Sequence, residues 1–221
     1  MQTFVRILDT VPVTHNVRHY RLERPANYRF SPGQATEVSI DRDGWRDEKR
    51  PFTFTCLPDA DELEFTIKSY FDHSGVTNEL WSLGAGDRLI LRDVWGTIQY
   101  KGKGTFIAGG AGVTPFIAIL RHLNASGKIA GNRLIVSNRT EKDIILREEF
   151  EAMEGLDVLW TLTDDPGSGL LQERIDAGFL ERHVPDLAQN FYLCGPDAMV
   201  GDLRGLLEAA GADVANVTWE R

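Results

Sequence analysis

The stretch Thr105–Phe116, T-F-I-A-G-G-A-G-V-T-P-F, runs from a short apolar strand through a glycine-rich turn into a helix. Glycine lets a backbone approach a diphosphate closely, and the unpaired N–H groups at a helix start attract negative charge. Pro115 fits the first helical position, which needs no N–H donor. The spacing follows neither the G-x-G-x-x-G nor the Walker pattern. Taken alone, the turn therefore indicates either a phosphate site or a tight connection.

The residues around this turn alternate between strands and helices. We expect strands at 105–108, 134–137, 158–163, 191–194 and 217–219, and helices at 115–126, 145–154 and from Pro196 to about Ala210. Strand–helix alternation predicts a parallel sheet with helices on both faces.

The preceding hundred residues have a different pattern. Short β-rich runs are expected to form strands at 3–9, 17–23, 35–40, 51–57, 62–70 and 87–92, with one helix near 74–83. Turns such as Ser31-Pro32-Gly33 separate them, which is typical of a small antiparallel barrel or sandwich. The polar stretch Lys101–Gly104 then divides the chain into domains 1–100 and 101–221.

Composition limits the class of protein. Of the 221 residues, 42% are hydrophobic and 26% charged, which is enough apolar content for a folded core. The net charge of −9 argues against binding nucleic acid or an anionic membrane surface. Two cysteines and five scattered histidines indicate neither a disulfide framework nor a metal site. No segment resembles a signal peptide or membrane span, so we expect a cytoplasmic protein.

A second turn, Cys194-Gly195-Pro196, ends another strand and starts the last helix. Ligands of open parallel sheets bind at the carboxyl ends of strands, so two such turns could flank one ligand. The alternative for Cys194 is an ordinary buried core cysteine.

Four segments in order carry a resemblance to a known family. They are Arg50-Pro51-Phe52-Thr53, Gly75-Val76-Thr77-Asn78, Gly109–Pro115 (G-G-A-G-V-T-P) and Tyr192–Pro196 (Y-L-C-G-P). Together the chain resembles the ferredoxin–NADP reductase superfamily over essentially its whole length. The resemblance implies an N-terminal antiparallel Greek-key β-barrel that binds flavin and a C-terminal, Rossmann-like α/β domain that binds a pyridine nucleotide.

The resemblance also implies flavin contacts. Arg50 would pair with the flavin diphosphate, because a planar guanidinium suits phosphate oxygens. Phe52, where the family usually has tyrosine, would pack on the isoalloxazine, and the Thr53 hydroxyl would face flavin N5. The other implied contacts are Pro51, then Ile67, Lys68 and Tyr70 on one strand, then Gly75, Val76 and Thr77 at a helix start. Without the family pattern, these residues would be ordinary surface, core and capping residues.

The implied nucleotide contacts are Gly110, Gly112, Thr114 and Pro115 in the first turn, Cys194, Gly195 and Pro196 in the second, and Asn138 and Asp143. The stretch Ser137–Arg147 is similar to the NADH-dependent cytochrome reductase branch, where an acid at the position of Asp143 lies near the adenosine ribose. A carboxylate accepts hydrogen bonds from ribose hydroxyls and repels a 2′-phosphate. Arg139 favours NADPH instead, because a guanidinium can bind the 2′-phosphate. On balance, NADH is expected over NADPH.

The implied enzyme is an FAD-dependent NAD(P)H:acceptor oxidoreductase with Thr53, Cys194 and Glu220 nearest to the chemistry. Hydride from NADH or NADPH would reduce the flavin, and the electrons would pass to an acceptor. The chain has no C-x4-C-x2-C run, so the acceptor is expected to be a separate carrier such as a ferredoxin, flavodoxin or haem protein. The alternative is a flavin-binding subunit of a larger complex without turnover of its own.

Overall fold

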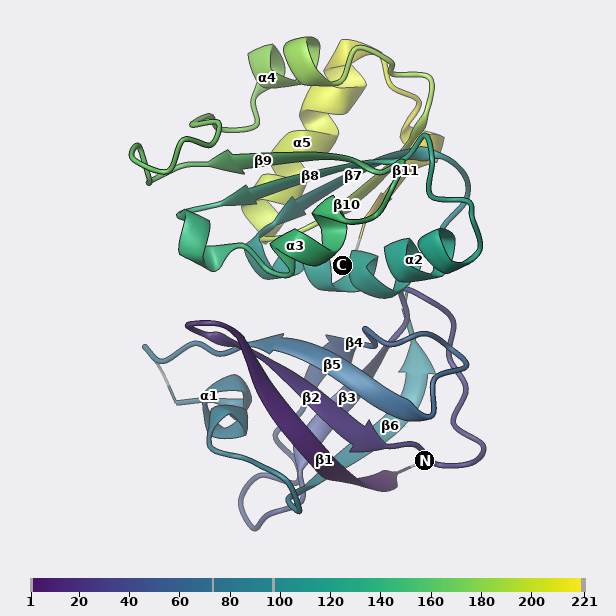
Figure 1. Cartoon of the computed structure of the whole chain (residues 1–221), viewed down its shortest axis with the longest axis vertical. Helices are drawn as coiled ribbons and strands as arrows, with labels where there is room; N and C mark the ends of the chain where they lie inside the picture. Colours follow the sequence, from purple (N-terminus) through teal and green to yellow (C-terminus); the bar gives the residue numbers. More distant parts are fainter. Residues whose placement is uncertain (1, 73, 97, 220–221) are drawn as a thin grey trace. The chain divides into compact units, whose positions relative to one another are not determined.

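The computed structural model describes residues 2–72, 74–96 and 98–219 (Figure 1). They divide into two compact units, one from residues 1–96 and 114–122, the other from residues 97–113 and 123–221. The first nine residues of the helix after the glycine turn thus group with the first unit. The domain limits expected from the sequence, 1–100 and 101–221, stay a prediction.

The first unit is an antiparallel barrel. Its elements are β1 (Thr3–Thr14), β2 (Val17–Glu23), β3 (Ala35–Ile40), β4 (Arg50–Thr53), β5 (Glu62–Lys68), α1 (Val76–Trp81) and β6 (Arg88–Trp95). The strand order is β4-β3-β6-β1-β2-β5, and every neighbouring pair is antiparallel. An antiparallel bridge between Phe54 and Phe65 joins the two outer strands and closes the sheet on itself. The predicted barrel is confirmed.

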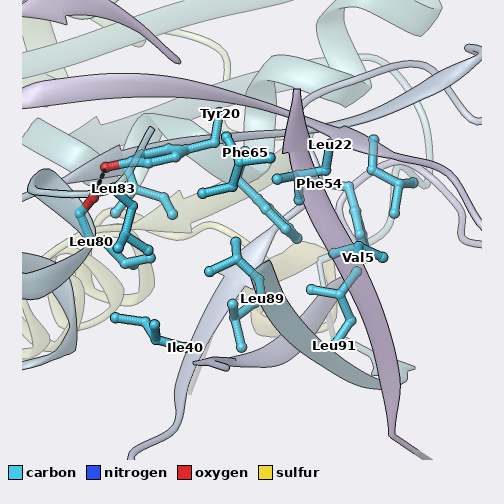
Figure 2. Packing of buried hydrophobic residues seen from close by; sticks show 14 of the residues in the cluster. Val5, Tyr20, Leu22, Ile40, Phe54, Phe65, Leu80, Leu83, Leu89 and Leu91 are labelled. Carbon is cyan, nitrogen blue, oxygen red and sulfur yellow. Dashed lines mark hydrogen bonds between the residues drawn. The ribbon is translucent and has the colours of Figure 1, made fainter. Parts of the chain in front are cut away.

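The barrel interior is filled by the inward side chains of its strands, together with residues of α1 (Figure 2). Alternation along each strand places one face inside, as on β1, where Val5 and Ile7 are buried while Phe4 is exposed. The buried Tyr20 hydroxyl donates to the Leu80 carbonyl at 3.0 Å and so attaches α1 to the barrel. Burial of this phenol raises its pKa to about 12.

The second unit is built on a parallel sheet. The strands are β7 (Gly104–Gly109), β8 (Arg133–Asn138), β9 (Asp157–Leu162), β10 (Asn190–Cys194) and β11 (Val217–Trp219). The helices of the C-terminal half are α2 (Thr114–Ala125), α3 (Arg147–Glu151), α4 (Ala177–His183) and α5 (Asp197–Ala210), with 3-10 turns η1 (Gly110–Val113), η2 (Glu141–Asp143) and η3 (Val214–Asn216). The strand order β11-β10-β7-β8-β9 is that of a doubly wound sheet and confirms the predicted α/β architecture (Figure 1).

Apolar and aromatic side chains pack on the strands of this sheet. Apolar side chains of α4 and α5 pack with Ile107, Ile135 and Leu193 in one core cluster. Elsewhere in the unit, the rings of Phe106 and Tyr192 stack with centroids 4.4 Å apart. The Tyr192 hydroxyl accepts from the Lys101 amide at 2.8 Å, which ties the segment before β7 to β10.

Some element limits differ from those expected. The strand expected at 51–57 ends at Thr53, because the chain then crosses to β5 through the Phe54–Phe65 bridge. The helix expected at 145–154 covers only Arg147–Glu151, since Leu146 before it has a left-handed backbone (φ 53°). Helix α4 was not expected. Within the described residues, no helix has the length and apolar character that a bilayer crossing requires.

Candidate functional site

Strand β4 presents the first group of expected flavin contacts. The Arg50 guanidinium is exposed; its Nη1 donates to the Lys49 carbonyl, and it forms no ion pair with any carboxylate that the structure describes. The Phe52 ring is half-buried, with its centroid 6.3 Å from that of Phe65. Thr53 is only 7% exposed, and its hydroxyl has no hydrogen-bond partner within the described residues. The strand thus offers an unpaired cation, a ring edge and an unused hydroxyl; Pro51 between them is exposed.

The end of β5 and the start of α1 carry the second group. The Ser69 hydroxyl donates to the Thr77 carbonyl at 2.7 Å, so these two segments lie together. Lys68 Nζ lies 5.8 Å from the centre of the Tyr70 ring, which is 46% exposed. Ile67 and Val76, in contrast, are core residues, each 1% exposed. We conclude that these two residues can face a ligand only through their backbone, as can Gly75, which precedes α1.

In the second unit, the two glycine turns pack against each other. A Cβ on Gly112 would lie 2.3 Å from the Cys194 carbonyl oxygen, and one on Gly195 (φ 157°) would lie 3.0 Å from the Gly109 nitrogen. A side chain at either position would force the two loops apart. The sequence suggested phosphate approach as the reason for the glycines of the first turn, whereas the structure gives close packing of the two loops as the direct reason for Gly112.

The place where the turns meet is also the point where the strand order reverses. From β7, the chain proceeds through β8 and β9 on one side of the sheet and returns to β10 and β11 on the other. In open parallel sheets, ligands bind outside the carboxyl ends of the strands at this reversal. Gly110–Val113 follows β7 directly, and Cys194 is the last residue of β10. The expected nucleotide residues of both turns therefore share one position in the fold.

Asn138, the last residue of β8, has an unused polar group beside the first turn. It is 5% exposed, and its Nδ2 has no hydrogen-bond partner in the described part of the chain. Its Oδ1 lies 3.9 Å from where a Gly110 Cβ would be. Leaving a buried amide N–H unpaired costs about 1–3 kcal/mol. A bound ligand at this turn would remove that penalty.

Asp143 has a structural role that the sequence analysis did not predict. Its Oδ2 accepts hydrogen bonds from the Thr140 amide at 3.1 Å and from the Thr140 hydroxyl at 2.6 Å, which closes a capping box on η2. Arg139 forms an exposed ion pair with Asp164 at 2.8 Å, and the hydrogen bond to Asp164 raises the pKa of Arg139. Thr140, Glu141, Lys142 and Asp165 line a shallow depression at this turn.

The remaining expected residues take these positions. Thr114 and Pro115 begin α2, Pro115 being buried and Thr114 half-buried, and Pro196 precedes α5. Glu220 lies outside the described residues. Among the described residues, no three side chains of His, Cys, Asp or Glu gather in a way that would hold a metal ion.

A polar network centred on Glu64 of β5 is not apparent from the sequence. Arg121 Nη1 donates to Glu64 Oε1 at 2.5 Å, and His19 Nε2 lies 2.6 Å from Oε2. The Thr55 hydroxyl donates to Oε1 at 2.8 Å. Burial alone would raise the pKa of Glu64, but the His19 hydrogen bond and the Arg121 charge outweigh it and lower the pKa to about 2. The carboxylate is therefore ionised at neutral pH.

Comparison with known proteins shows which proteins this chain is similar to. Residues 106–205 match the oxidoreductase NAD-binding domain family. NADH-cytochrome b5 reductase 1 of Rattus norvegicus is 30% identical, over 89% of this chain and 77% of that protein. The reductase component of propane 2-monooxygenase from Mycolicibacterium goodii is 28% identical over 92% of this chain, which spans 62% of that relative's length.

Two solved structures share the fold. The flavohaemoglobin-like FAD/NAD binding domain of nitric oxide dioxygenase from Vibrio cholerae superposes with a TM-score of 0.86 at 20% identity, covering 98% of this chain and 97% of that one. A ferredoxin NADP+ reductase from Neisseria gonorrhoeae gives 0.84 at 20% identity, covering 99% and 98%.

The class that these findings define is that of oxidoreductases which use FAD and a pyridine nucleotide. The chain belongs to the ferredoxin–NADP reductase superfamily, as the four segments predicted. The expected enzyme class and the two kinds of cofactor are confirmed, while the role of each site residue stays a prediction.

Proposed function

We propose that this protein takes hydride from NADH on bound FAD and passes the electrons to a separate redox protein. The observation that carries the proposal is the meeting of both glycine turns at the strand-order reversal of the parallel sheet, with the unpaired Nδ2 of Asn138 beside them. An unpaired buried amide beside the strand-order reversal, where open parallel sheets bind their ligands, fits a nucleotide site.

The barrel unit fits FAD. Arg50 has no carboxylate partner in the described part of the chain, and the hydroxyls of Thr53 and Thr77 make no hydrogen bond to described residues, so all three are available to a ligand. Arg50 and the Gly75–Thr77 segment would hold the diphosphate, and Phe52 would support the flavin ring. When bound, FAD supplies the redox chemistry, since a flavin accepts a hydride and releases electrons singly. The Thr53 hydroxyl would orient the reacting edge of the flavin by a hydrogen bond at N5.

The second unit would bind the nucleotide at its two turns, with Cys194 nearest to the nicotinamide; Thr114 directly follows the first turn. Three observations support NADH over NADPH. Arg139, a cation that could bind a 2′-phosphate, is already paired with Asp164. Two acids, Glu141 and Asp165, line the neighbouring depression against one cation, Lys142, and Asp143 adds a further carboxylate in the same turn. These carboxylates would repel a phosphate of charge about −1.5 to −2.

The acceptor would be a separate electron carrier protein. The relatives named above are a cytochrome b5 reductase and the reductase component of an oxygenase. Both names describe donors to another protein, which supports a separate protein acceptor here, and the class expected from the sequence is a haem protein, ferredoxin or flavodoxin. The cytoplasmic location expected from the sequence stays a prediction.

The test uses the purified, FAD-loaded protein. Anaerobic mixing with NADH should bleach the flavin faster than mixing with NADPH, and adding oxidised carriers in turn should identify one that restores the yellow spectrum through many cycles. No bleaching by either nucleotide would refute the proposal. A single bleaching with no turnover on any carrier would favour the alternative, a flavin-binding subunit without independent activity.

A further inference from the structure

Arg121 links α2 to two segments of the barrel unit. It lies seven residues, or about two helical turns, after Thr114. Its Nη1 donates to the Thr55 carbonyl at 2.7 Å and to Glu64 Oε1 at 2.5 Å. The Arg121 and Glu64 side chains are 21% and 18% exposed. An ion pair this far removed from water is weakly screened and holds its geometry more firmly than a surface pair.

Each segment that Arg121 holds also carries a residue of the proposed site. Thr55 lies two residues after Thr53, and Glu64 lies three residues before Ile67 on β5. Thr114, at the start of the helix, groups with the barrel unit, as do all residues of α2 up to His122. One guanidinium thus connects the segment directly after Thr53, the strand that carries Ile67 and the helix that carries Thr114.

The partners of Arg121 are themselves fixed. Glu64 Oε2 is paired with His19, whose other ring nitrogen lies 3.0 Å from the Thr66 hydroxyl. Thr66 donates to the Thr55 hydroxyl at 3.2 Å, which in turn donates to Glu64. Because both carboxylate oxygens are engaged, the position that Arg121 takes up is determined by β2, β5 and the segment after β4 together.

We propose that Arg121 is a positioning residue for hydride transfer, which sets Thr114 on α2 relative to Thr53 and Ile67. This inference rests on the proposed function. Arg121 exchanges neither a proton nor an electron in the reaction. Its effect is on the approach of donor and acceptor, and a misplacement of about 1 Å can slow an enzymic step by about 100-fold.

The experiment compares Arg121→Met with wild type, both loaded with FAD, in stopped-flow reduction by NADH. The limiting rate of flavin reduction should fall about 10- to 100-fold, while the Kd for NADH changes by less than about threefold. Arg121→Lys, which keeps one cationic nitrogen, should recover much of the rate. The matched control is Arg21→Met, since Arg21 pairs with Glu62 of the same strand β5 at 2.7 Å in an exposed position. Its rate should equal that of wild type.

The outcomes separate this inference from the proposed function. If wild type is not reduced by NADH or NADPH, the proposed function is wrong and the inference falls with it. If wild type is reduced and Arg121→Met is reduced equally fast per bound FAD, the inference alone is wrong and Arg121 only stabilises the fold. If Arg121→Met does not hold FAD, Glu64→Asp takes its place in the assay, because it draws the carboxylate back by one methylene group and keeps its charge. With full FAD occupancy, this variant should be reduced by NADH more slowly than wild type, and a wild-type rate of flavin reduction would overturn the inference.

Discussion

Glu64→Gln should make the protein less stable, by an amount that depends on pH. In the fold, the pKa of Glu64 is lowered from 4.5 to about 2. At about 1.36 kcal/mol per pKa unit, the ionised form gains about 3 kcal/mol from the fold relative to the protonated form. Because the folded pKa is the lower one, this stabilisation is fully present above about pH 4.5 and is lost as the pH falls toward 2. Glutamine keeps the size of the side chain and removes the titration.

The assay is urea denaturation of the FAD-loaded protein, followed by tryptophan fluorescence, at pH 7 and pH 3.5. The pH-dependent part of the difference in unfolding free energy between wild type and Glu64→Gln should fall from about 3 kcal/mol at pH 7 to about 2 kcal/mol at pH 3.5. Glu62→Gln on the same strand is the control; its partner Arg21 is exposed, so we expect less than about 1 kcal/mol at either pH. A difference for Glu64→Gln that stays constant between the two pH values would refute the reasoning.

Three further changes test other parts of the structure. Gly112→Ala should cost about 1–3 kcal/mol in urea denaturation and slow reduction by NADH, because the new methyl group would meet the Cys194 carbonyl; unchanged stability would contradict the loop packing. Arg50→Ala should lose bound FAD at unchanged circular dichroism, and full flavin occupancy would remove the diphosphate role. Tyr20→Phe should cost about 1 kcal/mol, since its hydroxyl bonds to Leu80; no loss in thermal or urea unfolding would count against that bond.

The sequence predicted the fold well because each unit consists of short elements whose patterns are local in the chain. The glycine turn, the alternation after Lys101 and the short strands before it are all readable along the chain. The first and last residues of single helices were harder to predict. Helix α3 is short because Leu146 adopts a left-handed backbone, which nothing in an I-L-R stretch indicates. Helix α4 did have a readable start, because the Asp176 side chain caps it by accepting from the Phe179 amide at 2.8 Å.

The candidate site was predictable only where a motif is continuous in sequence. Glu64 and Arg121 lie 57 residues apart, and neither stands in a recognisable motif. Their pairing depends on the tertiary fold alone. Gly112 was expected to contact the nucleotide, but its direct neighbour in the structure is the Cys194 carbonyl, which no inspection of the turn itself could show. Asp143 was expected to face a ribose, which stays a prediction, and the cap that it forms on η2 follows from its spacing to Thr140.

The Phe54–Phe65 bridge has a consequence for how the protein behaves at high concentration. At this bridge the two outer strands are paired with each other, so a neighbouring chain cannot add a strand at that point of the barrel. The seam is short, however, and the amide of Thr55 that bonds to the Glu64 carbonyl at 2.9 Å lies on it. We expect deuterium to enter the barrel first along this join.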